Sequence, residues 1–322
     1  MGITKNHQSG ETLRLMAAAA FPDKQLDEVK ELTEGMFNAA YLMEFADGTS
    51  AVAKIAAGTS EGFLSNEINL MAAEVAAMEL LGTEGVPKVP RVYYSDFSRS
   101  LCSGPYFIME RMPGRSLFAM REEVPREIQK QVYFEAGQLQ RRLTKVQGES
   151  FGLLGDQRRF ASLYEMLRFM FVNLLGDAAR IGLSFGFSED ALFRRLERDQ
   201  ACFDQVTVPS LVHWDMWEGN LFVDDGHLSG VIDWERAMWS DPFMDDRFRT
   251  RNYNPAFMEG FGIKEFTPQE KRRILWYDLF LHVTMYTESY YRQYDNIEDE
   301  IRWLTPQVEG AWAQLEKAVA VH

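Results

Sequence analysis

The sequence predicts an α+β fold with two lobes, and three observations favour it. Its 322 residues are 46% hydrophobic and 25% charged, a globular composition, and chains of this length often form two units. Strand-like runs separated by turn signals gather before residue 112, whereas helical patterns dominate afterwards. We therefore expect a small β-rich N-terminal lobe with one long helix, residues 1–112, and a larger, mainly helical C-terminal lobe, residues 113–322.

The N-terminal lobe is expected to be built on strands joined by short turns. Asp47-Gly48 is a strong hairpin signal, because both residue types tolerate the backbone angles of a tight turn. The Phe21-Pro22 step ends a first helix, since the residue before a proline avoids the α region. The five strand-like runs cover residues 28–33, 40–45, 50–56, 91–94 and 106–111.

Helices are expected where apolar residues recur at a spacing of three or four. Ser188 is placed as the N-cap of one such stretch, and Thr267 to Glu270 form a capping box that opens a helix running to about Tyr294. Residues 211–235 break the helical pattern with two short β-runs. The helical patterns cover residues 11–20, 63–81, 126–144 and 188–204.

Composition and charge disfavour several classes of function. Acidic residues outnumber basic ones by 48 to 34, and the formal charge of −14 disfavours binding to nucleic acid or to an anionic membrane surface. Cys102 and Cys202 are the only cysteines, so no disulfide framework is available. No apolar stretch is long enough for a membrane span, and residues 1–8 lack the apolar core of a signal peptide. We therefore expect a cytoplasmic protein with no obligate protein partner.

One segment of the C-terminal lobe carries the residues that phosphoryl transfer needs. His213 and Asp215 are followed by Asn220, and Asp233 lies thirteen residues further on, at the end of a strand. A carboxylate must orient the attacking hydroxyl and accept its proton, while amide and carboxylate oxygens hold Mg²⁺. The pattern favours Asp215 as the catalytic residue and Asn220 and Asp233 as metal ligands. His213 is expected to brace the loop by hydrogen bonding.

A nucleotide-binding lysine is expected on a strand of the N-terminal lobe, paired with a glutamate of the following helix. Lys54 lies in the otherwise apolar run of residues 51–56, where a charge needs a partner. Glu67 and Glu74 are seven residues apart and share nearly the same helix face. We prefer Glu74, because its neighbours are apolar.

Two backbone segments are expected to contact the nucleotide. Gly35 and Asn38 lie in a turn between the first two strands, where a phosphate-covering loop is expected, although a single glycine is also typical of a plain hairpin turn. The run at residues 106–114 leaves the small lobe for the large one. Its backbone is expected to face the crevice and to pair with the edge of adenine.

The acceptor is expected to be positively charged. Residues 211–250 contain nine acidic residues against three arginines, an excess that favours a cationic ligand. The acidic residues that we expect near the acceptor are Glu218, Glu235 and Glu288. Asp241 is assigned a structural role, because it precedes Pro242 as a helix cap and is expected to brace the catalytic loop. The tyrosine-rich run at residues 286–294 either lines the acceptor pocket or packs in the core.

These motifs resemble those of the aminoglycoside phosphotransferase and choline kinase-like family, which shares the bilobal protein-kinase fold. The resemblance runs from about residue 28 to the C-terminal helices and is most specific over residues 211–245. Residue by residue, it implies catalytic Asp215, metal ligands Asn220 and Asp233, phosphate-binding Lys54 with its partner Glu74, and main-chain contacts to adenine at Glu110 and Met112.

The sequence departs from the family pattern at Trp214, where the family usually has glycine. A bulky ring beside Asp215 is expected to reshape the acceptor side of the site. The segment Ile232 to Glu235 stands where a protein kinase has Asp-Phe-Gly, and no Ala-Pro-Glu follows it, which disfavours a protein substrate.

The resemblance implies an ATP- and Mg²⁺-dependent enzyme that transfers the γ-phosphate to a hydroxyl of a small, cationic molecule such as an aminoglycoside-like antibiotic. Choline or another amino alcohol, an amino sugar and homoserine stay open as acceptors. The alternative from a different class is a nucleotide-binding module without transferase activity. That alternative is disfavoured because every catalytic position is filled.

Overall fold

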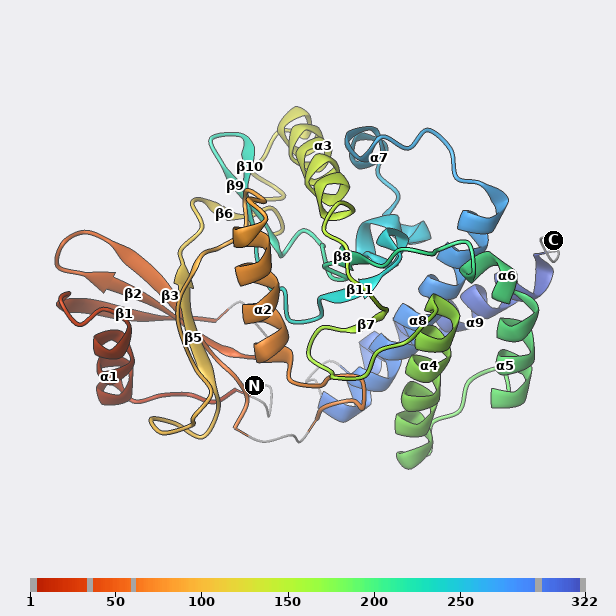
Figure 1. Ribbon diagram of the computed structural model, residues 1–322, viewed down its shortest axis with the longest axis horizontal. Coiled ribbons are helices and arrows are strands. Elements are labelled where there is room, and N and C mark those ends of the chain that lie inside the picture. Colours follow the sequence, from red (N-terminus) through yellow and green to blue (C-terminus); the bar gives the residue numbers. More distant parts are fainter. Residues whose placement is uncertain (1–4, 34–36, 59–61, 293–296, 319–322) are drawn as a thin grey trace.

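The computed structural model describes residues 5–33, 37–58, 62–292 and 297–318. It has an N-terminal antiparallel sheet and a larger, mainly helical C-terminal region, so the predicted α+β fold is confirmed (Figure 1). Among the described residues, none of the helices is both long and apolar enough to cross a bilayer.

The N-terminal sheet has five strands in the spatial order β1-β2-β3-β5-β4. Gly48 has a φ of +81° in the turn between β2 and β3, as the Asp47-Gly48 signal predicts. All five predicted strands are present, with ends that shift by one or two residues: β1 (Leu26–Leu32), β2 (Ala39–Phe45), β3 (Ser50–Ile55), β4 (Val92–Asp96) and β5 (Tyr106–Glu110).

Each face of this sheet is covered by one helix. Successive side chains of β3 point to opposite faces, so they pack alternately against the two helices. Ala51, Ala53 and Ile55 pack on the outer face with α1 (Gly10–Ala20). Val52 packs on the inner face with α2 (Leu70–Thr83), which lies between the sheet and the C-terminal region (Figure 1). Lys54 follows Val52 by two residues, so its side chain also points toward α2.

The helix expected over residues 63–81 is shorter than predicted. It begins at Leu70, because Asn69 has a left-handed backbone with φ 48° and ψ 42°, which a right-handed helix cannot continue. Leu64 is buried in the core and Glu67 is buried by ion pairs, so residues 63–69 show apolar spacing without forming a helix.

The C-terminal region contains seven α-helices among the described residues, and one of the predicted long helices needs correction. The helix expected over residues 188–204 is split at Asp199, although Ser188 caps its start as predicted. The capping box is confirmed: Thr267 N donates to Glu270 Oε2 over 2.7 Å, and Glu270 N to Thr267 Oγ1 over 3.2 Å. The helices are α3 (Arg126–Leu143), α4 (Leu163–Arg180), α5 (Glu189–Arg198), α6 (Gln200–Phe203), α7 (Pro255–Phe261), α8 (Pro268–Arg292) and α9 (Ile297–Lys317).

Two small antiparallel sheets hold the segment expected to carry the chemistry. One has the order β10-β9-β6 and the other β7-β11-β8. Val212 ends β8 and Leu221 begins β9, so residues 213–220 form a loop whose two ends belong to different sheets. The strands are β6 (Arg115–Ser116), β7 (Gly152–Leu153), β8 (Ser210–Val212), β9 (Leu221–Asp224), β10 (His227–Val231) and β11 (Met238–Ser240).

Candidate active site

His213 holds Asp215 in place through the backbone. The His213 ring is fully buried; its Nε2–H donates to the Ile232 carbonyl over 2.9 Å, and its Nδ1 accepts from the backbone N–H of Asp215 over 3.2 Å. Burial lowers the pKa of His213 to about 4, although Asp233 opposes this shift. At neutral pH the ring is therefore uncharged and carries its proton on Nε2, which suits a brace and not a proton acceptor.

Trp214 has a strained backbone in the middle of this loop. Its φ is 76°, a left-handed conformation that costs a residue other than glycine about 1–2 kcal/mol. Its N–H donates to Asp245 Oδ2 over 3.0 Å, and its carbonyl accepts from Asp246 N over 3.0 Å. These two hydrogen bonds hold the strained turn. Glycine suits this position because it adopts a positive φ without strain.

Asn220 and Asp233 are brought together by the backbone of Ile232. The Asn220 side-chain amide donates to the Asp215 backbone carbonyl over 2.8 Å, and the backbone carbonyl of Asn220 accepts from Ile232 N over 3.1 Å. Asp233 follows Ile232 with a φ of 68°. Two hydrogen bonds and the Ile232–Asp233 peptide bond therefore connect Asp215, Asn220 and Asp233 through the main chain.

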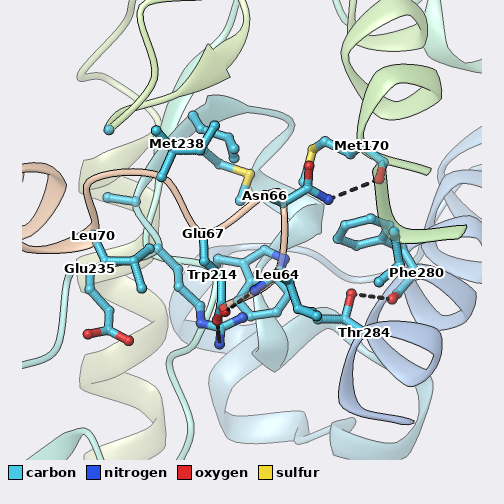
Figure 2. Close-up of a pocket in the computed structure, with 16 residues that line it drawn as sticks. Leu64, Asn66, Glu67, Leu70, Met170, Trp214, Glu235, Met238, Phe280 and Thr284 are labelled. Carbon is cyan, nitrogen blue, oxygen red and sulfur yellow. Dashed lines mark hydrogen bonds and ion pairs between the residues drawn. The ribbon is translucent and has the colours of Figure 1, made fainter. Parts of the chain in front are cut away.

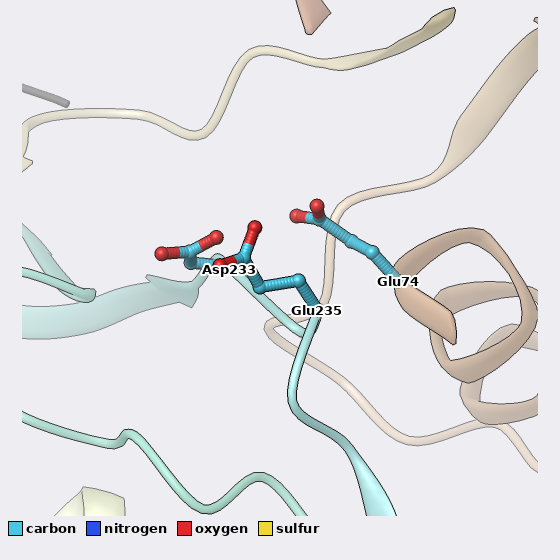
Figure 3. A group of neighbouring side chains, drawn as sticks. All are labelled: Glu74, Asp233 and Glu235. Carbon is cyan, nitrogen blue, oxygen red and sulfur yellow. The ribbon is translucent and has the colours of Figure 1, made fainter. Parts of the chain in front are cut away.

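Lys54 lies among three carboxylates that come from different elements. Its Nζ is 2.6 Å from Glu74 Oε2, contacts Asp233 Oδ1, and is 3.6 Å from Glu235 Oε2. The carboxylate oxygens of the three acids lie within 4.8 Å of one another (Figure 3). The pairing of Lys54 with Glu74 agrees with the preference for Glu74 over Glu67, which lies in a different ion network.

The electrostatics of this cluster follow from burial and from the single ammonium. Burial alone would lower the pKa of Lys54, but Asp233 and Glu74 outweigh it and raise that pKa well above its usual value. Burial alone would raise the pKa of Asp233, but Lys54 holds it below the ordinary range. Burial raises the pKa of Glu235, and the charge of Asp233 adds to that shift. Asp233 is therefore the acid in this cluster that most readily stays ionised.

Asp215 has a different environment. Burial raises its pKa well above the ordinary value; Arg236 opposes this, and Asp246 and Asp233 add to it. A carboxyl group with a raised pKa is better suited to accept a proton than an exposed aspartate is.

The structure gives the predicted nucleotide-contacting residues the following surroundings. Gly35 lies outside the described residues. The Asn38 side chain is buried and donates to Glu235 Oε2 over 2.8 Å. Glu110 ends β5, and its backbone N–H donates to the Arg91 carbonyl over 2.8 Å. Met112 is buried, and its side chain lies so close to Gly230 that a Cβ there would come within 2.5 Å of it.

The three acidic residues expected at the acceptor all have internal partners. The Tyr133 hydroxyl donates to Glu218 over 2.6 Å. Arg236 contacts Glu288 over 2.6 Å. Glu235 accepts from Asn38 and lies near Lys54. In the described part of the tyrosine-rich run, Tyr286 and Tyr291 pack against the hydrophobic core, whereas residues 293–294 lie outside the described residues.

The expectation that Asp241 braces the catalytic loop is wrong. Its Oδ1 accepts from Phe243 N over 3.2 Å and caps a single 3₁₀ turn, Pro242–Met244, in place of the expected helix. Its Oδ2 accepts from Arg273 Nε over 2.6 Å and from the Tyr277 hydroxyl over 2.8 Å, both on α8. The contact with the catalytic loop comes instead from Asp245, through Trp214 N.

Arg236 is a site residue that the sequence analysis counted only as a charge. Its guanidinium lies 4.9 Å from the centre of the Trp214 ring and donates to Glu67 over 2.8 Å and to Glu288 over 2.6 Å. It is also the cation that opposes the raised pKa of Asp215. The sequence signal that could have identified Arg236 is its position directly after Glu235, inside an acidic segment.

A mostly apolar cavity borders Trp214 and Arg236 (Figure 2). The segment before α2, with Leu64 and Glu67, forms one side of it. Met170 of α4 and Phe280 of α8 form another. The indole nitrogen of Trp214 is buried and has no hydrogen-bond partner among the residues that the structure describes. The Trp214 side chain therefore extends from the catalytic loop to line this apolar space, and a glycine at this position would contribute no side chain to that wall.

Known proteins match this chain in fold and in family. The family model described as "Phosphotransferase enzyme family" matches residues 28–245. No curated protein matches the chain. Solved structures with the same fold include two aminoglycoside phosphotransferase complexes. A thermostable aminoglycoside phosphotransferase APH(4)-Ia mutant in a ternary complex with ADP and hygromycin B is 17% identical, with a TM-score of 0.65, covering 96% of this chain and 100% of that one. A GDP and kanamycin complex of APH(2")-IIIa is 18% identical, with a TM-score of 0.61, covering 93% and 98%.

The family model spans more than two thirds of the sequence and includes Lys54, Glu74 and the whole loop from His213 to Asp233. It ends at Asp245, the residue that holds Trp214. The chain therefore belongs to the phosphotransferase enzyme family.

Proposed function

We propose that this phosphotransferase uses ATP and Mg²⁺ to phosphorylate a hydroxyl of a small, cationic molecule. The observation that supports this most is the connection of four residues: Lys54 pairs with Asp233, and main-chain hydrogen bonds at Ile232 and Asn220 connect Asp233 to Asp215. Phosphoryl transfer needs a cation for the phosphates, a metal site and a carboxylate for the hydroxyl within one short distance of each other.

The donor atoms fit Mg²⁺. The Asp233 carboxylate and the Asn220 side-chain oxygen are hard oxygen ligands, which magnesium prefers, and Lys54 holds the pKa of Asp233 below its ordinary value. Asn220 and Asp233 would hold the ion, which neutralises phosphate charge when it is bound. Lys54 would leave Asp233 for the nucleotide phosphates and keep its contact with Glu74.

The remaining residues position the two substrates. Residues 1–112 would form the nucleotide-binding lobe, with adenine paired to the Glu110 carbonyl and the Met112 amide. Asp215 would accept a hydrogen bond from the acceptor hydroxyl, orient it toward the γ-phosphorus and take its proton. His213 would hold Asp215 through its backbone while staying neutral.

The cationic acceptor rests on charge and on the fold neighbours. The chain carries a formal charge of −14, and an acidic surface draws cations toward a site. Hygromycin B and kanamycin appear in the complexes of the two neighbours. Because Glu218, Glu235 and Glu288 have internal partners, the attraction would come from the site as a whole. Amino alcohols, amino sugars and homoserine belong in the same panel of acceptors. We also propose a cytoplasmic location, which cell fractionation would test.

Asp215→Asn tests the proposal. We expect Mg²⁺-dependent transfer from ATP to the best hydroxyl compound of a panel to fall about 10²–10⁴-fold, because the loop keeps its shape but loses its proton acceptor. Asp225→Asn is the matched control: Asp225 is exposed in the turn between β9 and β10, and asparagine tolerates its φ of 47°.

Two results would contradict the proposal. A wild-type enzyme that binds ATP but phosphorylates nothing in the panel would favour the nucleotide-binding module. An Asp215→Asn variant that keeps more than about a tenth of the wild-type kcat would remove Asp215 from the chemistry.

A further inference from the structure

Two aromatic side chains form an exposed surface at the edge of the catalytic loop. Trp217 lies between Asp215 and Asn220, and its ring centroid is 5.2 Å from that of Phe118. Phe118 is 45% exposed and Trp217 is half-buried. We call these two rings the aromatic lip. Exposed apolar side chains that lie together are typical of binding surfaces, and this pair includes a residue of the loop that carries Asp215.

The backbone fixes the aromatic lip to the loop that it borders. Phe118 N donates to the Glu218 carbonyl over 3.1 Å, and Leu117 N donates to the Leu221 carbonyl over 2.7 Å. The segment that carries Phe118 is therefore hydrogen-bonded to both ends of the stretch that follows Trp217. Main-chain hydrogen bonds and the ring contact therefore both join Phe118 to the catalytic loop.

Local packing fixes the orientation of each ring. A Cβ at Gly219 would lie 2.1 Å from Trp217 Cζ2, so the indole rests directly on the glycine backbone. The Arg121 guanidinium lies 4.3 Å from the centre of the Phe118 ring, a cation–π distance that steadies the ring while leaving it exposed. A preorganised aromatic surface binds with little loss of side-chain freedom.

The acid next to these rings does not compete for the ligand. Glu218 accepts from Tyr133 over 2.6 Å and from Arg247 over 3.1 Å, so its charge is already matched. Apart from the Arg121 guanidinium over Phe118 and the Gly219 backbone against Trp217, the aromatic lip offers flat, apolar ring surface. Flat apolar rings bind the C–H face of a sugar or the face of an aryl group.

Resting on the proposed function, we propose that the aromatic lip binds a ring of the acceptor while the acceptor's hydroxyl meets Asp215. The occupant is the acceptor and not the nucleotide base, because Trp217 belongs to the loop that presents Asp215. An acceptor with a flat ring is held over Trp217 and Phe118, and an acyclic acceptor with the same charge and hydroxyl finds no such contact. Trp217 and Phe118 are thus specificity-determining residues for ring-bearing acceptors.

Two matched pairs of probes test this. Glucosamine and its ring-opened alditol share an ammonium and hydroxyls but differ in the ring, and 2-amino-1-phenylethanol and 1-aminooctan-2-ol differ in the same way with an aryl group. The two pairs distinguish a sugar ring from an aryl ring. Initial rates of the full chain with ATP and Mg²⁺ give kcat and KM for each probe and KM for ATP.

Trp217→Leu is the main variant, and Phe118→Leu keeps the test valid if the first does not fold. We expect KM for the ring-bearing probe to rise about tenfold, the lower range of ring stacking, while KM for its acyclic partner and for ATP change less than twofold. Trp303→Leu and Phe97→Leu are the controls, since each removes an aromatic ring that is 46% exposed elsewhere. Both should behave as wild type.

Three results would overturn the proposal. The wild type could prefer the acyclic member of both pairs. Trp217→Leu could raise KM equally for the ring-bearing and the acyclic probes, or it could raise KM for ATP instead. In each case phosphate transfer itself would still be observed. A wild type that transfers phosphate to no hydroxyl compound would instead refute the proposed function, and the role of the aromatic lip with it.

Discussion

Replacing Trp214 by glycine and by alanine should reverse the usual order of stability of these two residues. Both changes remove the same indole, which is 5% exposed, and each loses about 3–5 kcal/mol through the cavity that it leaves. That loss cancels when the two variants are compared. Alanine retains the left-handed strain of about 1–2 kcal/mol at a φ of 76°, and glycine loses about 0.5–1 kcal/mol through its freer unfolded chain. We expect the glycine variant to be more stable by about 0.5–1 kcal/mol.

The assay is urea unfolding, with the free energy of unfolding of each variant extrapolated to water. Trp303 provides the matched control, because it lies inside α9 and is 46% exposed. At that helical position alanine should be more stable than glycine by about 1 kcal/mol. The two positions should therefore give differences of opposite sign.

An alanine variant at position 214 that is as stable as the glycine variant, or more stable, would refute this reasoning. Trp214 would then have an ordinary backbone, and the bonds from its backbone to Asp245 and Asp246 would not be holding a strained turn. If the glycine variant is more stable than the alanine variant by less than the expected amount, the difference in free energy of unfolding would still come from the backbone, because both variants lack the indole.

Two further predictions concern the charged residues. Burial, Asp246 and Asp233 raise the pKa of Asp215 against the opposing charge of Arg236. We therefore expect kcat to fall as the pH drops through that raised pKa. A kcat that stays constant down to the ordinary aspartate pKa of about 3.9 would contradict the role of Asp215. Asp233→Asn should remove most of the increase in ATP affinity that Mg²⁺ causes, as measured by calorimetry, and asparagine tolerates the left-handed φ at this position. The control Asp224→Asn, at an exposed position, should preserve that increase. An increase that survives in Asp233→Asn would exclude the metal site.

The pH prediction has a counterpart in stability. A carboxyl group whose pKa is raised by folding contributes stability at low pH that is lost as pH rises through the raised value. Asp215→Asn should therefore raise the melting temperature, and by more at about pH 8 than at about pH 4. A lower melting temperature at the higher pH would mean that the Asp215 carboxylate is stabilised in the folded chain.

Local signals in the sequence predicted much of this fold. The turn at Asp47-Gly48 and the capping box at Thr267 are short-range features, and each forms as expected. The position of Lys54 opposite α2 follows from strand alternation, and Glu74 follows from its apolar neighbours on the helix. These features depend on residues close together in the chain, so a single sequence contains the information for them.

The errors arise where a distant partner decides the outcome. Asp199 ends a helix within the stretch expected to be continuous, and its carboxylate accepts from Arg272 and Trp276 of α8. Asp241 braces α8 and not the catalytic loop, because its partners lie more than thirty residues away. Glu288 looked available for an acceptor, but it pairs with Arg236. The sequence contains all of these side chains, but it does not show which ones meet.

The contacts of Lys54 have a consequence for the thermodynamics of ligand binding. Without ligands, the Lys54 ammonium matches Asp233, and Asn38 is bound to Glu235, so the N-terminal sheet and the C-terminal loop satisfy each other's polar groups. Nucleotide and metal would replace these internal partners one for one: the phosphates would take the place of a carboxylate, and the ion the place of an ammonium. Binding is then an exchange of ion pairs in which few counterions are released. The affinity for the metal–nucleotide complex should depend only weakly on salt, in contrast to sites that meet phosphate with unpaired lysines.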